Sequence, residues 1–129
     1  MLKDSKAFSG FSVNDLEAAK KFYGQTLGLE VEEQKDMGFS INVAGGTPIF
    51  VYPKPDHTPA SFTILNFPVD DIDKVVDELL TAGVEFERYD NMPGEQDEKG
   101  IMRSTSPEDG PSIAWFKDPA GNILSVLSN

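Results

Sequence analysis

The sequence has 129 residues, which is enough for one domain of ordinary size or two small modules that share a core, and too few for two independent domains. Its 22 acidic side chains against 11 Lys and Arg give a formal net charge of −11, so neither nucleic acid nor an anionic membrane surface is an expected partner. Cysteine is absent, which excludes disulfide scaffolds and cysteine nucleophiles, and His57 is the only imidazole. No apolar run approaches about 18 residues and the N-terminus has no signal-peptide core, so we expect a cytoplasmic protein.

A repeat relates the two halves of the chain. Residues 11–17, Phe-Ser-Val-Asn-Asp-Leu-Glu, return at 67–73 as Phe-Pro-Val-Asp-Asp-Ile-Asp, an offset of 56 residues. Both copies lead into a helical pattern that ends at a glycine, and from Gly28 to Gly83 the offset is 55. One residue has therefore been lost or gained within the helix. The repeat predicts a single domain over 1–129 that is built from two modules.

The predicted boundaries place module one at about 7–53 and module two at about 61–128. Three prolines fall between residues 53 and 59, so the connector at 54–60 is expected to be extended.

Each module is predicted to contain a strand, a helix and three further strands. Phe11 and Val13 alternate with small or polar residues, which gives the period of two of a half-buried strand. Helical patterns follow, with caps expected at Asn14 in module one and Asp70 in module two. The predicted hairpins are 39–44 with 48–52, and 112–116 with 123–127; the stretch 90–111 is predicted to be a long acidic loop with one short strand around 101–103.

Three segments carry a family resemblance. They are residues 11–23 with Leu27-Gly28-Leu29, residues 67–73, and Trp-Phe-Lys-Asp-Pro-Ala-Gly-Asn-Ile at 115–123. In combination they resemble the vicinal oxygen chelate superfamily, which includes glyoxalases, extradiol dioxygenases, fosfomycin-modifying enzymes and bleomycin-binding resistance proteins. The resemblance implies an α+β fold in which two tandem βαβββ modules form a curved sheet around a shared cavity, with the helices outside. It also implies a homodimer.

The resemblance further implies where a metal would bind. In metal-using members the first and last strands of each module supply His, Glu or Gln ligands, and the shared motifs carry these positions to Phe8, Phe50, Ile64 and Ser125. A divalent ion needs several imidazole, carboxylate or thiolate donors at one point, and these side chains do not supply them. We therefore expect no metal and no cofactor, and a cavity that is mainly apolar.

Strand alternation sorts the residues that remain as candidates for ligand binding. Those that alternate with the helix-facing set are expected to contact a small-molecule ligand, namely Phe8, Phe50, Tyr52, Ile64, Asn66 and Ser125; Trp115 is a further candidate whose face alternation does not assign. Asn66 offers a donor and an acceptor to a ligand, unless a neighbouring side chain or a water satisfies it. Tyr52 is either a ligand contact or an ordinary aromatic residue at the rim, and Trp115 either walls the cavity or fills the helix-side core.

Three functions remain open at this point, and no catalytic residue is assigned. The first is a protein that binds an apolar or aromatic molecule without a metal, as bleomycin-binding relatives do. The second is a glyoxalase- or dioxygenase-type enzyme that uses displaced metal ligands or metal-independent chemistry. In the second case His57 beside Asp56 is a candidate base, and otherwise His57 is a solvated loop residue. Arg103 and Lys54 either steer an anionic ligand or pair with neighbouring acids. The third possibility is a domain that serves to dimerise.

Overall fold

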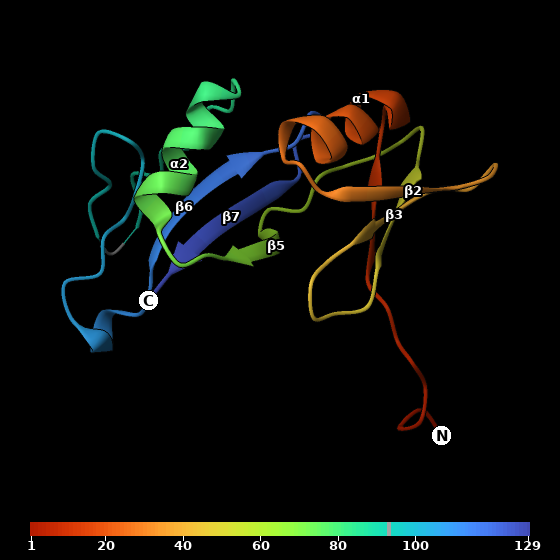
Figure 1. Cartoon of the computed structure of the whole chain (residues 1–129), viewed down its shortest axis with the longest axis horizontal. Helices are drawn as coiled ribbons and strands as arrows, with labels where there is room; N and C mark the ends of the chain where they lie inside the picture. The colour runs from red at the N-terminus through yellow and green to blue at the C-terminus, as the bar shows by residue number, and fades with distance from the viewer. Residues whose placement is uncertain (93) are drawn as a thin grey trace. The chain divides into compact units, whose positions relative to one another are not determined.

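The computed structural model of the protein describes residues 1–92 and 94–129. The chain forms two compact units, Met1–Thr58 and Pro59–Asn129, and each unit is built on one sheet (Figure 1). Together they hold α-helices and mixed sheets of four and three strands, so the fold is α+β, as the sequence predicts. Among the described residues, no helix has the length and the apolar character that crossing a membrane requires.

The first unit is a four-stranded sheet with one helical segment packed against it. The strands β1 (Gly10–Val13), β2 (Glu30–Gln34), β3 (Gly38–Asn42) and β4 (Ile49–Pro53) lie in the order β1-β4-β3-β2, and α1 (Leu16–Lys21) and η1 (Phe22–Thr26) connect β1 to β2. On the helix side of the sheet Val13, Phe39 and Val51 are fully buried. Phe11 meets Tyr23 of η1 with 5.7 Å between the ring centroids. The alternation predicted for the first strand is therefore confirmed.

A π-helical turn accounts for the extra residue of the first module. The backbone N–H of Leu27 donates to the carbonyl of Phe22 at 2.9 Å, five residues back, where an α-helix would bond four back. Such a turn accommodates one inserted residue within a helix. The change in repeat offset therefore lies at 22–26, and the turn leaves Gly24 against Val31 of β2, where a Cβ would come to 3.5 Å.

The second unit has three regular strands and one long helix. Strands β5 (Thr63–Pro68), β6 (Ser112–Lys117) and β7 (Ile123–Ser128) lie in the order β5-β7-β6, and α2 (Ile72–Thr81) packs on β6 and β7 (Figure 1). Val76 of α2 and Phe116 and Leu124 of the sheet are buried in this core. Burying side chains of this size contributes about 1.5–3 kcal/mol each. The second helix and both predicted hairpins are confirmed.

One detail of the second module differs from the expectation. The strand expected after α2 is reduced to isolated bridges, with Phe86 opposite Phe116, and the short strand expected around 101–103 is reduced to the bridges of Met102 with Gln96 and Ile113. Here the side chain of Gln96 makes hydrogen bonds to the backbone that a neighbouring strand would otherwise make. Its amide donates to the carbonyls of Glu87 and Gly100, both at 2.8 Å, and accepts from the N–H of Tyr89 at 2.7 Å. Backbone groups that a ladder would pair are thus satisfied by one side chain.

The predicted helix caps are wrong by one residue in each module. Asp15, not Asn14, accepts from the N–H of Ala18, and Asp71, not Asp70, accepts from the N–H of Lys74, each at 3.1 Å. The capping oxygen must reach an amide two or three residues onward, and in both motifs the second of two polar residues has that position and an extended backbone.

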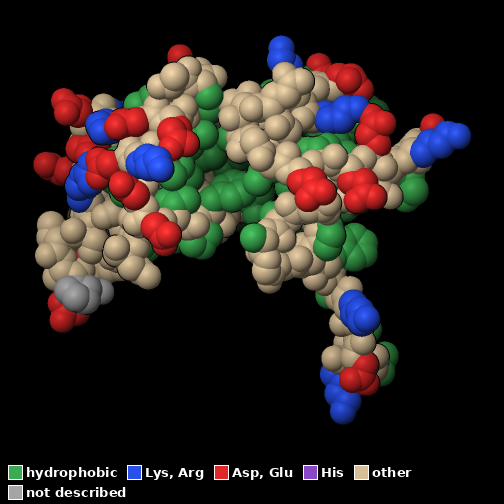
Figure 2. All heavy atoms as spheres, in the orientation of Figure 1, with side chains coloured by type: hydrophobic (Ala, Val, Ile, Leu, Met, Phe, Trp, Pro, Cys, Tyr) green, Lys and Arg blue, Asp and Glu red, His purple; other side chains and the backbone are tan. Residues whose placement is uncertain are grey.

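Ion pairs fasten the loop 90–111 to α2. Arg103 donates to both carboxylate oxygens of Asp73, at 2.6 and 2.9 Å, and also to Asp97 at 3.0 Å, while Lys99 pairs with Asp77 at 2.9 Å. Acidic and basic side chains are interspersed over this part of the surface (Figure 2). The loop also contains a short turn, η2 (Pro107–Asp109). Of the two alternatives for Arg103, pairing with neighbouring acids is confirmed.

The pairing predicts a pH-dependent stability. Hydrogen bonds from Arg103 lower the pKa of Asp73 from 3.8 to about 2. Because the folded-state pKa lies below the unfolded value, the pair stabilises the fold above about pH 4 and this contribution is lost as the pH falls toward 2. We expect Asp73→Asn to flatten the fall in unfolding free energy between pH 4 and 2, measured by urea denaturation, and an unchanged slope would count against the pair.

Candidate functional site

Two predicted residues share one face of the first unit. Strand β1 is parallel to β4, so Gly10 pairs with Phe50 and Ser12 with Tyr52. Paired residues of neighbouring strands point to the same side of a sheet, which here is the side away from Phe11 and Val13. The rings of Phe50 and Tyr52 stack with 5.8 Å between centroids and 17° between planes. The unit therefore presents an aromatic pair on the face that its helix does not cover.

His57 lies against the same strand. Its Nδ1 is 2.6 Å from the hydroxyl oxygen of Ser12, and both residues are partly buried, so His57 is not the solvated loop residue that the sequence allowed. The connector is held there by the N–H of Lys54, which donates to the carbonyl of Val13 at 2.9 Å. Lys54 also donates to Asp56 at 2.6 Å, and this hydrogen bond lowers the pKa of Asp56. Lys54 thus pairs with a neighbouring acid.

In the second unit, three predicted residues form one row across the sheet. Asn66 of β5 pairs with Ser125 of β7, and Ser125 pairs with Trp115 of β6. Their side chains share the face opposite Leu124 and Phe116, so Trp115 lies on the face away from α2 and is not part of the helix-side core. Ser125 is fully buried and its hydroxyl donates to Oδ1 of Asn66 at 2.5 Å.

Phe8 and Ile64 lie less regularly than the other predicted residues. Phe8 precedes β1 and its exposed fraction is 66%. The register of β5 on β7 shifts between Thr63 and Leu65, so Ile64 is the extra residue of a bulge. Because alternation is interrupted at a bulge, the period-two argument does not fix the direction of the Ile64 side chain.

Comparison with known proteins shows the family. The sequence model of the Glyoxalase/Bleomycin resistance protein/Dioxygenase superfamily matches residues 8–126. The chain belongs to this superfamily. No curated protein matches the sequence.

Solved structures of the same fold come from several bacteria. A glyoxalase family protein from Bacillus anthracis is 21% identical, with 100% of this chain and 99% of that chain covered and a TM-score of 0.66. The antibiotic binding protein TnmS3 from Streptomyces sp. CB03234 is 24% identical, with 97% of each chain covered and a TM-score of 0.64. The lactoylglutathione lyase of Agrobacterium tumefaciens is 18% identical, with 100% and 96% covered and a TM-score of 0.64. At this identity the likeness establishes the shared fold.

Tyr89 borders the candidate site, and the sequence did not predict this. Its ring meets Trp115 edge to face, with 5.5 Å between centroids, so it borders the row of Asn66, Ser125 and Trp115. Its hydroxyl is buried and has no hydrogen-bond partner among the described residues. Burial, and then the charge of Glu87, raise the pKa of Tyr89, so the phenol stays protonated. A tyrosine in a polar loop carries no sequence signal of such an environment.

The unpartnered hydroxyl predicts a stabilising substitution. Tyr89→Phe removes a buried donor that makes no bond, so we expect the unfolding free energy to rise by about 1 kcal/mol in chemical denaturation. Ser125→Ala is the matched control, because it removes a buried hydroxyl that does donate and should lower the unfolding free energy by a similar amount. A loss of stability in Tyr89→Phe would show that the hydroxyl is bonded.

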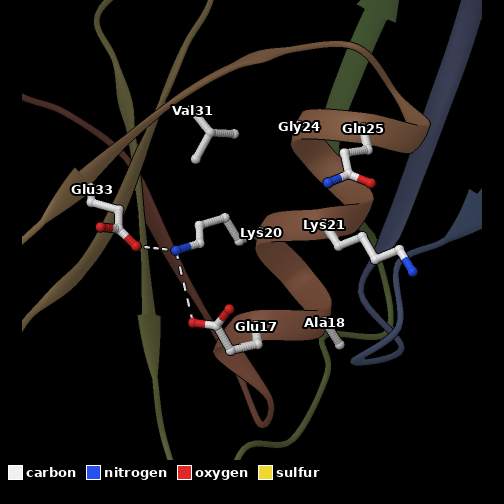
Figure 3. A pocket seen from close by; sticks show the side chains of 8 residues that line it. All are labelled: Glu17, Ala18, Lys20, Lys21, Gly24, Gln25, Val31 and Glu33. Atoms are coloured by element: carbon white, nitrogen blue, oxygen red, sulfur yellow. Dashed lines mark hydrogen bonds and ion pairs between the residues drawn. The ribbon is translucent and has the colours of Figure 1, made fainter.

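Two hollows in the first unit lie away from these faces. One, of about 620 Å³, lies between α1, η1 and β2 and is lined by Glu17, Ala18, Lys20, Lys21, Gly24, Gln25, Val31 and Glu33 (Figure 3). Lys20 is held within it by ion pairs to Glu17, at 3.7 Å, and to Glu33. The other is lined by Leu16, Pro53 and residues 33–38. Neither hollow is lined by a residue that the sequence analysis predicts to contact a ligand, and in the first the charges of Lys20, Glu17 and Glu33 are already paired.

Within 1–92 and 94–129, no three His, Cys, Asp or Glu side chains gather in a way that could hold a metal ion.

Proposed function

We propose that the protein is a metal-independent binding protein for an apolar or aromatic small molecule. The observation that carries the proposal is the composition of the sheet faces that the helices leave uncovered. One face presents the stacked rings of Phe50 and Tyr52, and the other holds Trp115, which is 8% exposed, in one row with the hydrogen-bonded amide of Asn66. Aromatic surface with few polar groups is typical of small-molecule sites. That TnmS3 is named an antibiotic binding protein agrees with this function.

The donor set does not fit the metal of metal-using relatives. Of the four positions that the family resemblance implies, Phe8, Phe50 and Ile64 carry no donor atom, and the hydroxyl of Ser125 is already bonded to Asn66. A divalent ion held at these positions would lack the imidazole and carboxylate ligands it requires. We therefore assign no reaction step to a metal.

A thermal-shift screen of the EDTA-treated protein against aromatic and amphipathic compounds tests the proposal. We expect at least one compound to raise the melting temperature, because a ligand that binds only the folded state stabilises it. Replacing Tyr52 or Trp115 with alanine should reduce that shift. A screen in which no compound stabilises the protein unless a metal is added would overturn the proposal.

The contact of His57 with Ser12 favours a second candidate function. A histidine 2.6 Å from a hydroxyl, on the face that carries Tyr52, is placed for metal-independent proton transfer to a bound substrate. Because one structural neighbour is named a lactoylglutathione lyase, formation of lactoylglutathione from methylglyoxal and glutathione is the assay. Turnover by EDTA-treated protein that His57→Gln abolishes would establish an enzyme, and no turnover would leave the binding function.

The proposal includes the setting expected from the sequence. In this proposal the protein is a homodimer in the cytoplasm. It binds a small-molecule ligand, and it binds neither nucleic acid nor a membrane. Light scattering after gel filtration tests the homodimer.

A further inference from the structure

We propose that Ser125 holds the amide of Asn66 as a donor subsite, which selects ligands that carry a neutral acceptor oxygen such as a ketone or amide carbonyl. The inference rests on the proposed function, because it names the ligand chemistry of the same sheet face. Ser125 is a positioning residue in this account, and Asn66 is the group that touches the ligand.

The hydroxyl of Ser125 decides which way the amide faces. Ser125 has no exposed surface, and the partner of its hydroxyl is Oδ1 of Asn66 at 2.5 Å. If the amide were turned over, its nitrogen would face the hydroxyl, and the hydroxyl proton would lose this acceptor. Burial makes an unmade donor bond costly, so the serine favours the orientation in which Oδ1 faces it.

Because Oδ1 of Asn66 accepts the hydrogen bond from Ser125, the amide nitrogen of Asn66 is the atom that can donate to a ligand. The two N–H groups of Asn66 have no hydrogen-bond partner among the described residues, and the residue is exposed. An amide nitrogen has donors and no acceptor. A ligand that meets this position finds two donors in a fixed direction, which is the complement of a carbonyl oxygen.

The rest of the row agrees with such a ligand. Trp115 lies two strands from Asn66 on the same face and is 8% exposed, so a ligand bound at Asn66 would meet only the exposed margin of the indole. The hydroxyl of Tyr89, whose ring meets Trp115, is also a donor, and it is buried without a hydrogen-bond partner among the described residues. Glu87 and Lys117 at the edge of the sheet pair with each other at 3.3 Å. The net charge of −11 disfavours anionic ligands.

Two matched probes test the selection, 2-acetylnaphthalene, which has a carbonyl, and 2-ethylnaphthalene, which does not. Their affinities for the full chain are measured by titration in ¹⁵N–¹H NMR spectra, where the side-chain amide of Asn66 gives its own signals. We expect the ketone to bind at least about fivefold more tightly than the hydrocarbon, since one hydrogen bond distinguishes them. We also expect the ketone alone to shift the Asn66 amide signals.

Two variants separate the donor from its positioning residue. Asn66→Leu keeps the size of the side chain and removes both donors, so the ratio of the ketone affinity to the hydrocarbon affinity should fall to about one. Ser125→Ala keeps the amide and frees it to rotate, so the preference should fall and the Asn66 amide signals should shift even without ligand. A serine that only stabilises the fold would leave the preference ratio unchanged in its variant.

The outcomes separate the two proposals. Equal binding of both probes, or a ketone preference that survives in Asn66→Leu, would overturn the donor subsite and leave the proposed function intact. Failure of both probes to bind would count against the proposed function and the subsite together.

Discussion

Gly38→Ala is expected to lower the unfolding free energy by more than about 4 kcal/mol, because the added methyl group has no space and the backbone conformation disfavours a side chain. Gly38 has φ 146°, and a Cβ built on it would lie 2.0 Å from the carbonyl oxygen of Val51 and 3.1 Å from Cα of Tyr52. Both of these atoms are backbone, so β3 and β4 would have to separate. The substitution would therefore also displace Tyr52 and the aromatic pair of the first unit.

Gly45→Ala is the matched control for this effect. Gly45 also has a positive φ, 72°, but no atom lies within 4 Å of its added Cβ, so the substitution carries only the backbone cost of about 1–2 kcal/mol. Urea denaturation of both variants measures the difference. If the two variants lost equal stability, the close approach of β3 to β4 at Gly38 would be wrong.

Asp118→Ala is expected to cost about 3 kcal/mol. The carboxylate is 4% exposed and accepts three hydrogen bonds of 2.9 Å, from the N–H of Ala120, the N–H of Asn122 and the side-chain amide of Asn122. Bonds to a charged acceptor contribute more than neutral ones, and the buried amides would lose their partner together. The turn joins β6 to β7, so the positions of Trp115 and Ser125 depend on it.

Chemical denaturation and the near-ultraviolet circular dichroism of the single tryptophan check this prediction. Glu108→Ala serves as the control, since its exposed carboxylate accepts one bond from Ser106 and should contribute less than about 0.5 kcal/mol. A cost for Asp118→Ala no larger than that of the control would contradict the structural role. The Asp-Pro-x-Gly-Asn segment contributes to the family resemblance. Its role here is structural, because it stabilises the turn between two strands of the sheet that carries the candidate site.

Local patterns explain how much of the fold could be predicted. Alternation places Phe11 and Val13 on the helix side because side chains in a strand change face at every residue. The repeat offset predicts that one residue has been lost or gained within the helix, and the structure locates the change in the turn at 22–26 of the first module. The caps differ by one residue because neighbouring Asn or Asp residues are equivalent in sequence and only their backbone conformation separates them.

The candidate site depends on contacts that no local pattern contains. The contact of His57 with Ser12 spans 45 residues, and that of Ser125 with Asn66 spans 59. The bulge at Ile64 changes the register of β5, which a regular period of two does not predict. Tyr89 reaches Trp115 because the segment before it pairs along β6 through the bridge at Phe86. Composition alone suggests none of these contacts.

The most direct test of the central claim is the affinity of EDTA-treated protein for 2-acetylnaphthalene, measured by NMR titration with and without one equivalent of Zn²⁺. Binding without a chelated metal predicts the same dissociation constant in both titrations, within about twofold. Binding that appears only after Zn²⁺ is added would contradict the account, because the side chains at Phe8, Phe50, Ile64 and Ser125 supply no donor set for such an ion.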